Sequence, residues 1–296
     1  MDLPAIALAA GLAGWAPVSV VTPVPVPADP AVPLVVASPS GALIGWDALI
    51  DGLLSARVIA IGEKHDSAPH HLAQARVLEA LADRDPNLVV GLEMVATDQQ
   101  AFLDDFLSGK KSEADFSAWW KKAWGFDYPL YKPIFDAARA RRLRVVGLNA
   151  PRALVRAVAK KGLVGLTPDE RAGLPASVRE SDDARYRDYV KNSMSGHDLP
   201  PDALQRMTEA MAVWNEAMGA KAAELSASAR VLVIAGQGHV FWRAGIPESA
   251  LRRGAGMAAV LLPYPLDGET RPLPEQLKRL RDPASDELSR ADAFLL

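Results

Sequence analysis

Five runs dominated by apolar residues recur along the chain. They lie at residues 57–62, 87–93, 143–149, 230–236 and 256–262. A short, continuous apolar run is typical of a strand that is buried on both faces of a sheet. Segments with helical spacing separate most of these runs. Strands that alternate with helices predict an α/β protein with a mostly parallel sheet flanked by helices.

The segments between the strands predict helices through their periodicity and their turn residues. Ser67 can cap a helix whose first turn contains Pro69. Residues 167–228 are polar and helical without a strand signal, which predicts a helical insertion before the last strands. Other helices are expected at residues 46–54, 98–107, 113–123 and 130–142, and from about Pro151.

The two ends of the chain differ from the central region. Residues 1–33 join an apolar stretch at 5–21 to a proline-rich stretch. The apolar stretch resembles the hydrophobic region of a secretory signal without its basic flank, and a disordered tail is the alternative. Residues 267–296 are charged and rich in turn residues. We therefore expect one domain over residues 34–266, opening with a hairpin over residues 34–44.

Composition narrows the classes of function. A chain of 296 residues can bury one large core, and a net charge of −3 without a long basic block argues against a nucleic-acid partner. The absence of cysteine excludes disulfides, thiolate metal sites, iron–sulfur clusters and a cysteine nucleophile. No segment of the predicted domain is long and apolar enough to be a transmembrane segment.

Acidic and histidine side chains gather where the predicted strands end. Glu63 and His65 follow the first run, Glu93 ends the second, and His239 follows the fourth. In parallel α/β sheets, ligands bind in the crevice beyond the carboxyl ends of the strands. A carboxylate buried there needs a partner, because an unpaired buried charge is costly. His70 and His71 would lie in the first turn of the next helix, where the helix dipole favours neutral imidazoles. Because neighbouring helical positions point about 100° apart, only one of the two is expected to face the crevice.

This group of side chains is compatible with two kinds of chemistry. Histidine and glutamate together can hold zinc, manganese or iron, and they can equally form an acid/base site without metal. Spacing alone does not choose between them, and a plain capping role for Glu63 and Glu93 is a further alternative. The candidate metal ligands are Glu63, His65, His71, Glu93 and His239, and the candidate catalytic residues are Glu63, His65, Glu93 and His239.

Aromatic residues form a second group of interest. Those between residues 119 and 135 are expected to pack in the core, although the loop at 124–129 is of the kind that shapes pockets for large flat ligands. Tyr186 and Tyr189 lie three residues apart on one face of the helical insertion. A tyrosinate can ligate ferric haem iron. An exposed polar helix face is the alternative interpretation.

Five segments, taken in order, resemble those of a known family. They are Ile61-Gly62-Glu63-Lys64-His65-Asp66 with His70-His71, Gly91-Leu92-Glu93-Met94, the aromatic segment Trp119 to Phe135, Gly147-Leu148-Asn149-Ala150-Pro151-Arg152, and Ala235-Gly236-Gln237-Gly238-His239 followed by Gly245-Ile246-Pro247. Their order resembles that of the ChaN-like haem-binding proteins, within the Tiki/TraB/erythromycin-esterase grouping. The resemblance covers roughly residues 45–265, and only the ordered set is specific.

The resemblance implies a parallel α/β core with an inserted helical region. It also implies a haem-binding protein of bacterial iron and haem uptake, located in the periplasm or cell envelope. Relatives hold the iron through a tyrosine and place two haems face to face across a homodimer. The candidate haem ligands here are Tyr186, Tyr189 and Tyr131, in that order.

The same resemblance leaves other functions open. Related members of the superfamily are hydrolases or metal-dependent proteases, which implies a hydrolase built on the four candidate catalytic residues as the alternative. A third alternative is a regulatory protein that keeps the scaffold without the chemistry. The chain also departs from the family pattern. It lacks the lipidated cysteine common in relatives, and Trp214-Asn215 stands where Trp-Asp is usual.

Overall fold

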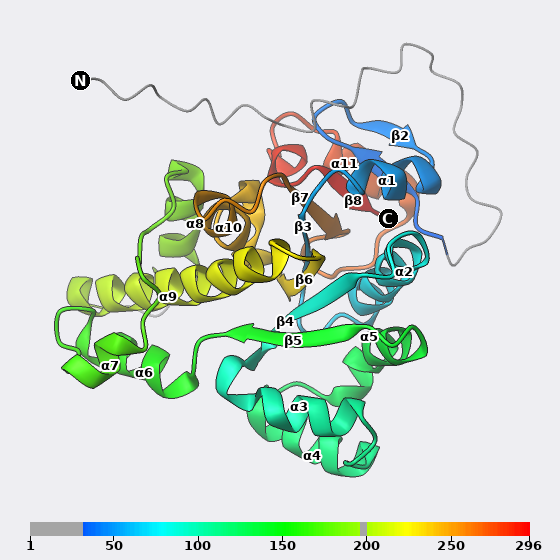
Figure 1. The fold of residues 1–296 in the computed structure, drawn as a ribbon. Coiled ribbons are helices and arrows are strands. Elements are labelled where there is room, and N and C mark those ends of the chain that lie inside the picture. Colours follow the sequence, from blue (N-terminus) through cyan, green and yellow to red (C-terminus); the bar gives the residue numbers. More distant parts are fainter. Residues whose placement is uncertain (1–31, 196–199) are drawn as a thin grey trace.

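One sheet of eight strands organises the part of the chain that the computed structural model describes, residues 32–195 and 200–296. Its order is β2-β1-β8-β7-β3-β6-β4-β5, and the layers of helix around it are seen in Figure 1. The predicted α/β fold with a mostly parallel sheet is confirmed. The strands are β1 Val35–Ala37, β2 Ala42–Ile44, β3 Val58–Glu63, β4 Leu88–Ala96, β5 Arg144–Asn149, β6 Arg230–Gly236, β7 Ala258–Pro263 and β8 Ala293–Leu295.

The five long strands that the apolar runs predict are present, and neighbours among them pair in parallel. The predicted hairpin is also present as β1 and β2, which pair antiparallel. Strand β8 was not predicted, because it has three residues at the end of a charged segment. It lies between β1 and β7, and backbone hydrogen bonds of 2.9 and 2.8 Å join Leu34 to Leu296 beside it.

Most helices lie where the periodicity predicts them, whereas the last two, α10 and α11, were not predicted. The helices are α1 Trp46–Leu53, α2 Ala68–Arg84, α3 Gln100–Leu107, α4 Glu113–Ala123, α5 Tyr128–Ala140, α6 Arg152–Lys161, α7 Pro168–Ala172, α8 Ala184–Ser195, α9 Pro201–Ser226, α10 Ile246–Arg252 and α11 Leu273–Leu280. Helices α7, α8 and α9 form the expected insertion before β6. Ser67 occupies the N-cap position of α2, but its side chain makes no capping hydrogen bond. The signal-like stretch at 5–21 lies outside the described residues.

The sheet is buried on both faces, as the apolar runs require. Ile59 and Ile61 of β3 point into a core shared with α1, α2 and the helices α3 to α5. Val58 and Ala60 of the same strand point into a second core with α8, α9 and α10. A smaller apolar cluster joins α6 to α9. Each face of the sheet therefore has its own helical layer.

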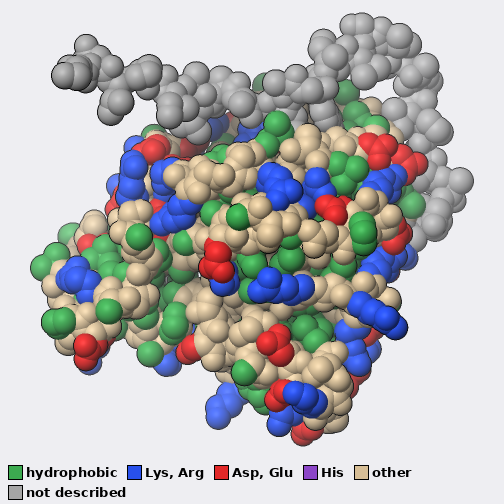
Figure 2. All heavy atoms as spheres, viewed as in Figure 1, with side chains coloured by type: hydrophobic (Ala, Val, Ile, Leu, Met, Phe, Trp, Pro, Cys, Tyr) green, Lys and Arg blue, Asp and Glu red, His purple; other side chains and the backbone are tan. Residues whose placement is uncertain are grey.

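The surface carries charges of both signs. Figure 2 shows Lys and Arg side chains scattered among Asp and Glu side chains over the face in view. Within residues 32–195 and 200–296, no helix has the length and the apolar character that crossing a membrane demands.

Candidate functional site

The strand order brings the predicted acid and histidine residues together. Strand β6 lies between β3 and β4, so the carboxyl ends of all three strands are adjacent, and Glu63 pairs in register with Gly236. Glu63 and Glu93 are almost fully buried, with exposed fractions of 1% and 5%. We call Glu63, His65, His71, Glu93 and His239 the acid–histidine site.

Glu63 leaves the sheet on the face that α2 and α5 cover. His65 Nδ1 lies 2.5 Å from Glu63 Oε1, and His71 Nε2 lies 3.3 Å from Glu63 Oε2. The Tyr131 hydroxyl donates to Glu63 Oε1 at 3.4 Å and accepts from Trp124 Nε1 at 3.0 Å. His71 is completely buried, whereas the His65 side chain is 31% exposed. His65 is thus the member of this half that solvent reaches.

The charges in this half stabilise each other. Burial raises the pKa of Glu63, but hydrogen bonds and positive charge from His65 and His71 outweigh it and hold the pKa below its usual range. Burial in turn lowers the pKa of His65, and the Glu63 carboxylate outweighs that effect and raises it. The buried carboxylate is therefore ionised, and the imidazole that faces it favours its protonated form.

Glu93 leaves the sheet on the opposite face, which α9 covers. Its Oε2 accepts from the Gly236 backbone N–H at 2.6 Å, and its Oε1 lies 3.1 Å from His239 Nε2. Burial raises the pKa of Glu93, but His239, His65 and the Gly236 amide outweigh it and lower the pKa to about 2. Glu93 is therefore a buried anion that binds the turn after β6 directly.

A chain of hydrogen bonds continues from His239 into the helical insertion. The Gly238 carbonyl can only accept, so the Tyr186 hydroxyl donates to it at 2.8 Å and accepts from Asn215 Nδ2 at 2.9 Å. Asn215 Oδ1 then accepts from His239 Nδ1 at 2.7 Å. With that nitrogen donating, His239 Nε2 can also donate to Glu93 only as an imidazolium.

Gly236 separates the two halves of the acid–histidine site. A Cβ atom at this position would lie 2.7 Å from His65 Cε1 and 3.5 Å from Glu93 Oε2. A Cβ contact of 2.7 Å essentially never occurs, so glycine at this position lets the His65 ring approach Glu93 across the end of β6. The glycines that flank the predicted motif therefore have a steric role in assembling it.

His70, the neighbour of His71, has a different task. Its Nδ1 accepts from the Lys64 backbone N–H at 3.0 Å, and its Nε2 donates to the Pro265 carbonyl at 3.1 Å. Burial lowers the pKa of His70 and favours this neutral form. Only His71 faces the acid–histidine site, as the 100° step between helical neighbours predicts.

The structure does not support the predicted metal site. Among the described residues, no three His, Asp or Glu side chains are placed to hold one ion. The reason lies in the partners: His65 Nδ1 faces Glu63, and both ring nitrogens of His239 are engaged by Asn215 and Glu93. The arrangement is instead a pair of hydrogen-bonded acid–histidine units.

The aromatic segment divides into core and rim. Trp120 and Phe135 are fully buried in the first core, as expected. Trp124 and Phe126 flank the exposed edge of His65, with ring centroids 4.8 and 5.1 Å from the imidazole. The predicted loop is shorter than expected, because α5 already begins at Tyr128.

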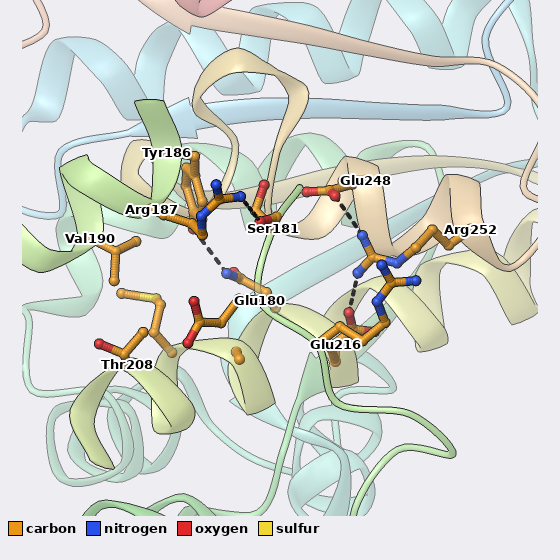
Figure 3. A pocket seen from close by; sticks show the side chains of 14 residues that line it. Glu180, Ser181, Tyr186, Arg187, Val190, Thr208, Glu216, Glu248 and Arg252 are labelled. Atoms are coloured by element: carbon orange, nitrogen blue, oxygen red, sulfur yellow. Dashed lines mark hydrogen bonds and ion pairs between the residues drawn. The ribbon is translucent and has the colours of Figure 1, made fainter. Parts of the chain in front are cut away.

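Two of the three candidate tyrosines are buried with their hydroxyls engaged. Tyr131 bonds to Glu63 and Trp124, and Tyr186 bonds to Gly238 and Asn215. Burial raises the pKa of both hydroxyls. Tyr186 lines a pocket of only about 20 Å³, in which Arg252 bridges two glutamates (Figure 3). A space of that size holds about one water molecule.

The third tyrosine lies on a half-exposed aromatic surface. The ring of Tyr189 contacts Phe241 and Trp242, with centroids 5.1 and 6.1 Å away. The guanidinium groups of Arg290 and Arg185 lie over Trp242, at 5.3 and 5.6 Å from its centroid. Unlike the other two, the Tyr189 hydroxyl makes no hydrogen bond with a described residue. We call these five residues the α8–η3 patch, after α8 and the short 3₁₀ helix η3, Phe241–Arg243.

Sequence reasoning missed three members of this patch. Phe241 and Trp242 follow the last motif directly, and their aromatic character was an available signal. Arg290 was not predictable in the same way, because it reaches the patch from the 3₁₀ helix η4, Glu287–Arg290, about 50 positions further along the chain.

Comparison with known proteins bears on this geometry. The sequence model of a family described as haem-binding uptake, Tiki superfamily, ChaN matches residues 49–249. The chain belongs to this family. This match confirms the predicted resemblance, and the description of the family names haem binding. Among curated proteins, none matches the chain.

Solved structures agree on the fold. The structure described as cofacial heme binding to ChaN of Campylobacter jejuni has a TM-score of 0.65 and 20% identity, covering 89% of this chain and 96% of that one. A variant of the erythromycin esterase EreC in its open conformation has a TM-score of 0.43 and 13% identity, covering 74% of this chain and 72% of that one. The type III effector HopBA1 also has a TM-score of 0.43, with 14% identity, covering 73% and 81%. The similarity to the Campylobacter jejuni ChaN structure shows a shared fold. The other two similarities are too low to support an inference.

Proposed function

We propose that this protein binds haem in bacterial haem or iron uptake, and that the haem lies on the α8–η3 patch with Tyr189 as the iron ligand. The observation that carries the proposal is the Tyr189 hydroxyl, which bonds to no residue within 32–195 and 200–296 and lies beside the half-exposed Trp242 ring. Family membership supplies the ligand class, and the patch supplies groups that suit it.

Tyr189 is favoured over the other two candidates by accessibility. Binding iron through Tyr186 or Tyr131 would break hydrogen bonds inside the core and would need space that the small pocket beside Tyr186 lacks. Burial raises the pKa of Tyr189 too, but the positive charge of Arg290 acts against it. A nearby cation favours the tyrosinate that ferric iron requires.

The chemistry of the patch fits a haem in each of its parts. The half-exposed Trp242, packed on the buried Phe241, offers apolar ring surface to a flat macrocycle. Arginine offers donors to carboxylates, and a phenolate is an established ligand of ferric haem iron. When bound, haem would supply the iron, and the protein would supply the phenolate and the surface that orients the ring.

A haemin titration followed by visible absorbance tests the proposal. We expect saturable binding to the wild-type protein, loss of the iron–tyrosinate spectrum in Tyr189→Phe, and its retention in Tyr186→Phe and Tyr131→Phe. Loss in Tyr186→Phe alone would assign the ligand to the buried tyrosine. Absence of saturable binding to the wild-type protein would exclude the haem function.

Homodimer formation and a periplasmic or cell-envelope location belong to the same proposal. The cofacial haems of the Campylobacter jejuni ChaN support a dimer in which haem takes part. Sedimentation velocity with and without haemin tests this, since a haem-linked dimer should gain mass on binding. Fractionation of the native cells tests the location.

A hydrolase remains the second candidate, and it concerns the acid–histidine site. The observation that favours it is the partly exposed imidazole of His65, oriented through Nδ1 by Glu63. A Glu–His pair of this kind can transfer protons to and from a bound substrate, with Glu93 and His239 beside it. Turnover of an activated ester, abolished by His65→Gln while haem binding persists, would support this function. No turnover above that of His65→Gln would exclude it for esters.

A further inference from the structure

Arg290 differs from the other arginines of the patch region in lacking an anionic partner. Its Nε is buried without a hydrogen bond, and no described carboxylate lies within ion-pair distance of it. Its contacts are the ring faces of Phe241 and Trp242, at 5.1 and 5.3 Å. A buried donor on a charged group costs free energy unless an acceptor satisfies it.

The segment that carries Arg290 is firmly held. Trp242 Nε1 donates to Ser289 Oγ at 3.0 Å, and the Tyr264 hydroxyl donates to the buried Glu287 at 2.7 Å. Arg243 forms an ion pair with the buried Asp292, two residues after Arg290 in the sequence. The segment from which Arg290 reaches the patch is therefore held in place before any ligand arrives.

Trp242 itself is held in an unusual backbone conformation. Its φ of 57° and that of Arg243, 58°, lie in the left-handed region, which side chains other than glycine rarely adopt. Strain of this kind persists only where the surroundings enforce it, and it is concentrated at ligand sites. In this conformation the Trp242 ring lies within cation–π distance of both Arg185 and Arg290.

We propose that Arg290 is the carboxylate anchor of the α8–η3 patch and sets its preference for tetrapyrroles with free propionates. This inference rests on the proposed haem function and names the group by which the ligand is selected. A propionate beside Arg290 would pair with its part-exposed guanidinium while the macrocycle lies on Trp242. Arg185 is not equivalent, because Asp183 already binds its guanidinium at 2.6 Å.

The experiment uses protoporphyrin IX and its dimethyl ester as probes, with binding followed by quenching of tryptophan fluorescence. Neither probe contains iron, so the result does not depend on ligation by Tyr189. We expect the wild-type protein to bind the free acid about tenfold or more tightly than the ester, in line with hydrogen bonds to charged groups. Arg290→Gln should abolish that preference, and Arg290→Lys should keep part of it.

Arg185→Gln is the matched control, since it removes an arginine from the same ring but one that already has a carboxylate. It should change the preference by less than about threefold. Equal affinity of the wild-type protein for both probes, or no binding of either, would overturn the inference. Retention of the preference in folded Arg290→Gln would overturn it as well. Haemin binding without any ester discrimination would leave the haem function standing and remove only the anchor.

Discussion

The acid–histidine site and the α8–η3 patch lie next to each other, but they satisfy their polar groups in opposite ways. Glu93 and His239 are buried and bound to each other, to Asn215 and to the backbone of Gly236. In the patch, by contrast, Arg290 has no anionic partner in the part of the chain that the structure describes. Buried charges must be paired to be tolerated, so the first region can be required for folding whether or not it does chemistry. The second region has groups available for a ligand.

The turn after β6 connects the two regions. Residues 236–242 run from the amide that Glu93 binds to the aromatic rings of the patch. The Tyr186 hydroxyl holds the Gly238 carbonyl in the middle of this segment. We infer that the acid–histidine site positions the patch, and substitutions in one region alone test whether the two can be separated.

The largest effect is expected from Glu93→Ala. Removing the carboxylate leaves the buried His239 side chain and the Gly236 amide without their partner. Breaking a buried pair in this way costs about 3–5 kcal/mol of unfolding free energy. Urea unfolding measures it, with Glu113→Ala as control, because Glu113 pairs with Lys132 on the surface and should cost at most about 1 kcal/mol. Equal losses in the two variants would contradict the structural role of Glu93.

Acid should weaken the same region. The folded pKa of Glu93, about 2, is below the usual 4.5, so its stabilising contribution is complete above about pH 4.5 and disappears as the pH falls towards 2. The shift corresponds to roughly 3 kcal/mol. Unfolding free energy measured between pH 6 and pH 3 should fall more steeply for the wild-type protein than for Glu93→Gln. Parallel pH profiles would show that Glu93 is not the group responsible.

Much of the fold is predictable from the sequence because periodicity reflects burial directly. The apolar runs predict β3 to β7, and the carboxyl ends of β3, β4 and β6 converge because a parallel sheet aligns them. Strand β8 escapes prediction because its three residues acquire meaning only through pairing with β1 and β7. A short strand has too few positions for alternation to emerge.

The site was predictable to the extent that it lies at strand ends. Glu63 and Glu93 were expected together, and the structure places both at the carboxyl ends of the central strands. Asn215 was noted only as a departure from a family pattern, although it binds His239. Its contact, like that of Arg290 with Trp242, joins segments far apart in sequence through side chains alone. No local pattern records such contacts.

A smaller effect is expected from Asn215→Ala, which cuts the hydrogen-bond chain between the two regions. His239 Nδ1 loses its acceptor and the Tyr186 hydroxyl loses a donor, both in the core. An unsatisfied buried group of this kind costs about 1–3 kcal/mol. Asn87→Ala is the control, since its amide bonds at the surface. If haemin affinity is unchanged while the free energy of unfolding falls, these hydrogen bonds stabilise the fold without positioning the patch.

The finest test compares alanine at two glycines in the same turn. A Cβ at Gly236 would lie 2.7 Å from His65 Cε1, whereas one at Gly238 would lie 2.9 Å from the Tyr189 hydroxyl. Neither contact involves backbone, so each substitution should cost only about 1 kcal/mol while displacing one side chain. Gly236→Ala should return the raised pKa of His65 towards its ordinary value, followed by NMR titration, because the ring is pushed from Glu63. Haemin affinity should be unchanged.

Gly238→Ala should do the reverse. The displaced Tyr189 hydroxyl should weaken haemin binding severalfold and leave the His65 titration as it is in the wild-type protein. Each variant is then the control for the other, because both add one methyl group within three residues. Should both variants lose haemin affinity to the same degree, the turn acts as one rigid unit, and the acid–histidine site and the patch form a single site. If Gly236→Ala changes only the His65 titration and Gly238→Ala changes only the haemin affinity, the structure at the strand ends and ligand binding at α8 are separable properties.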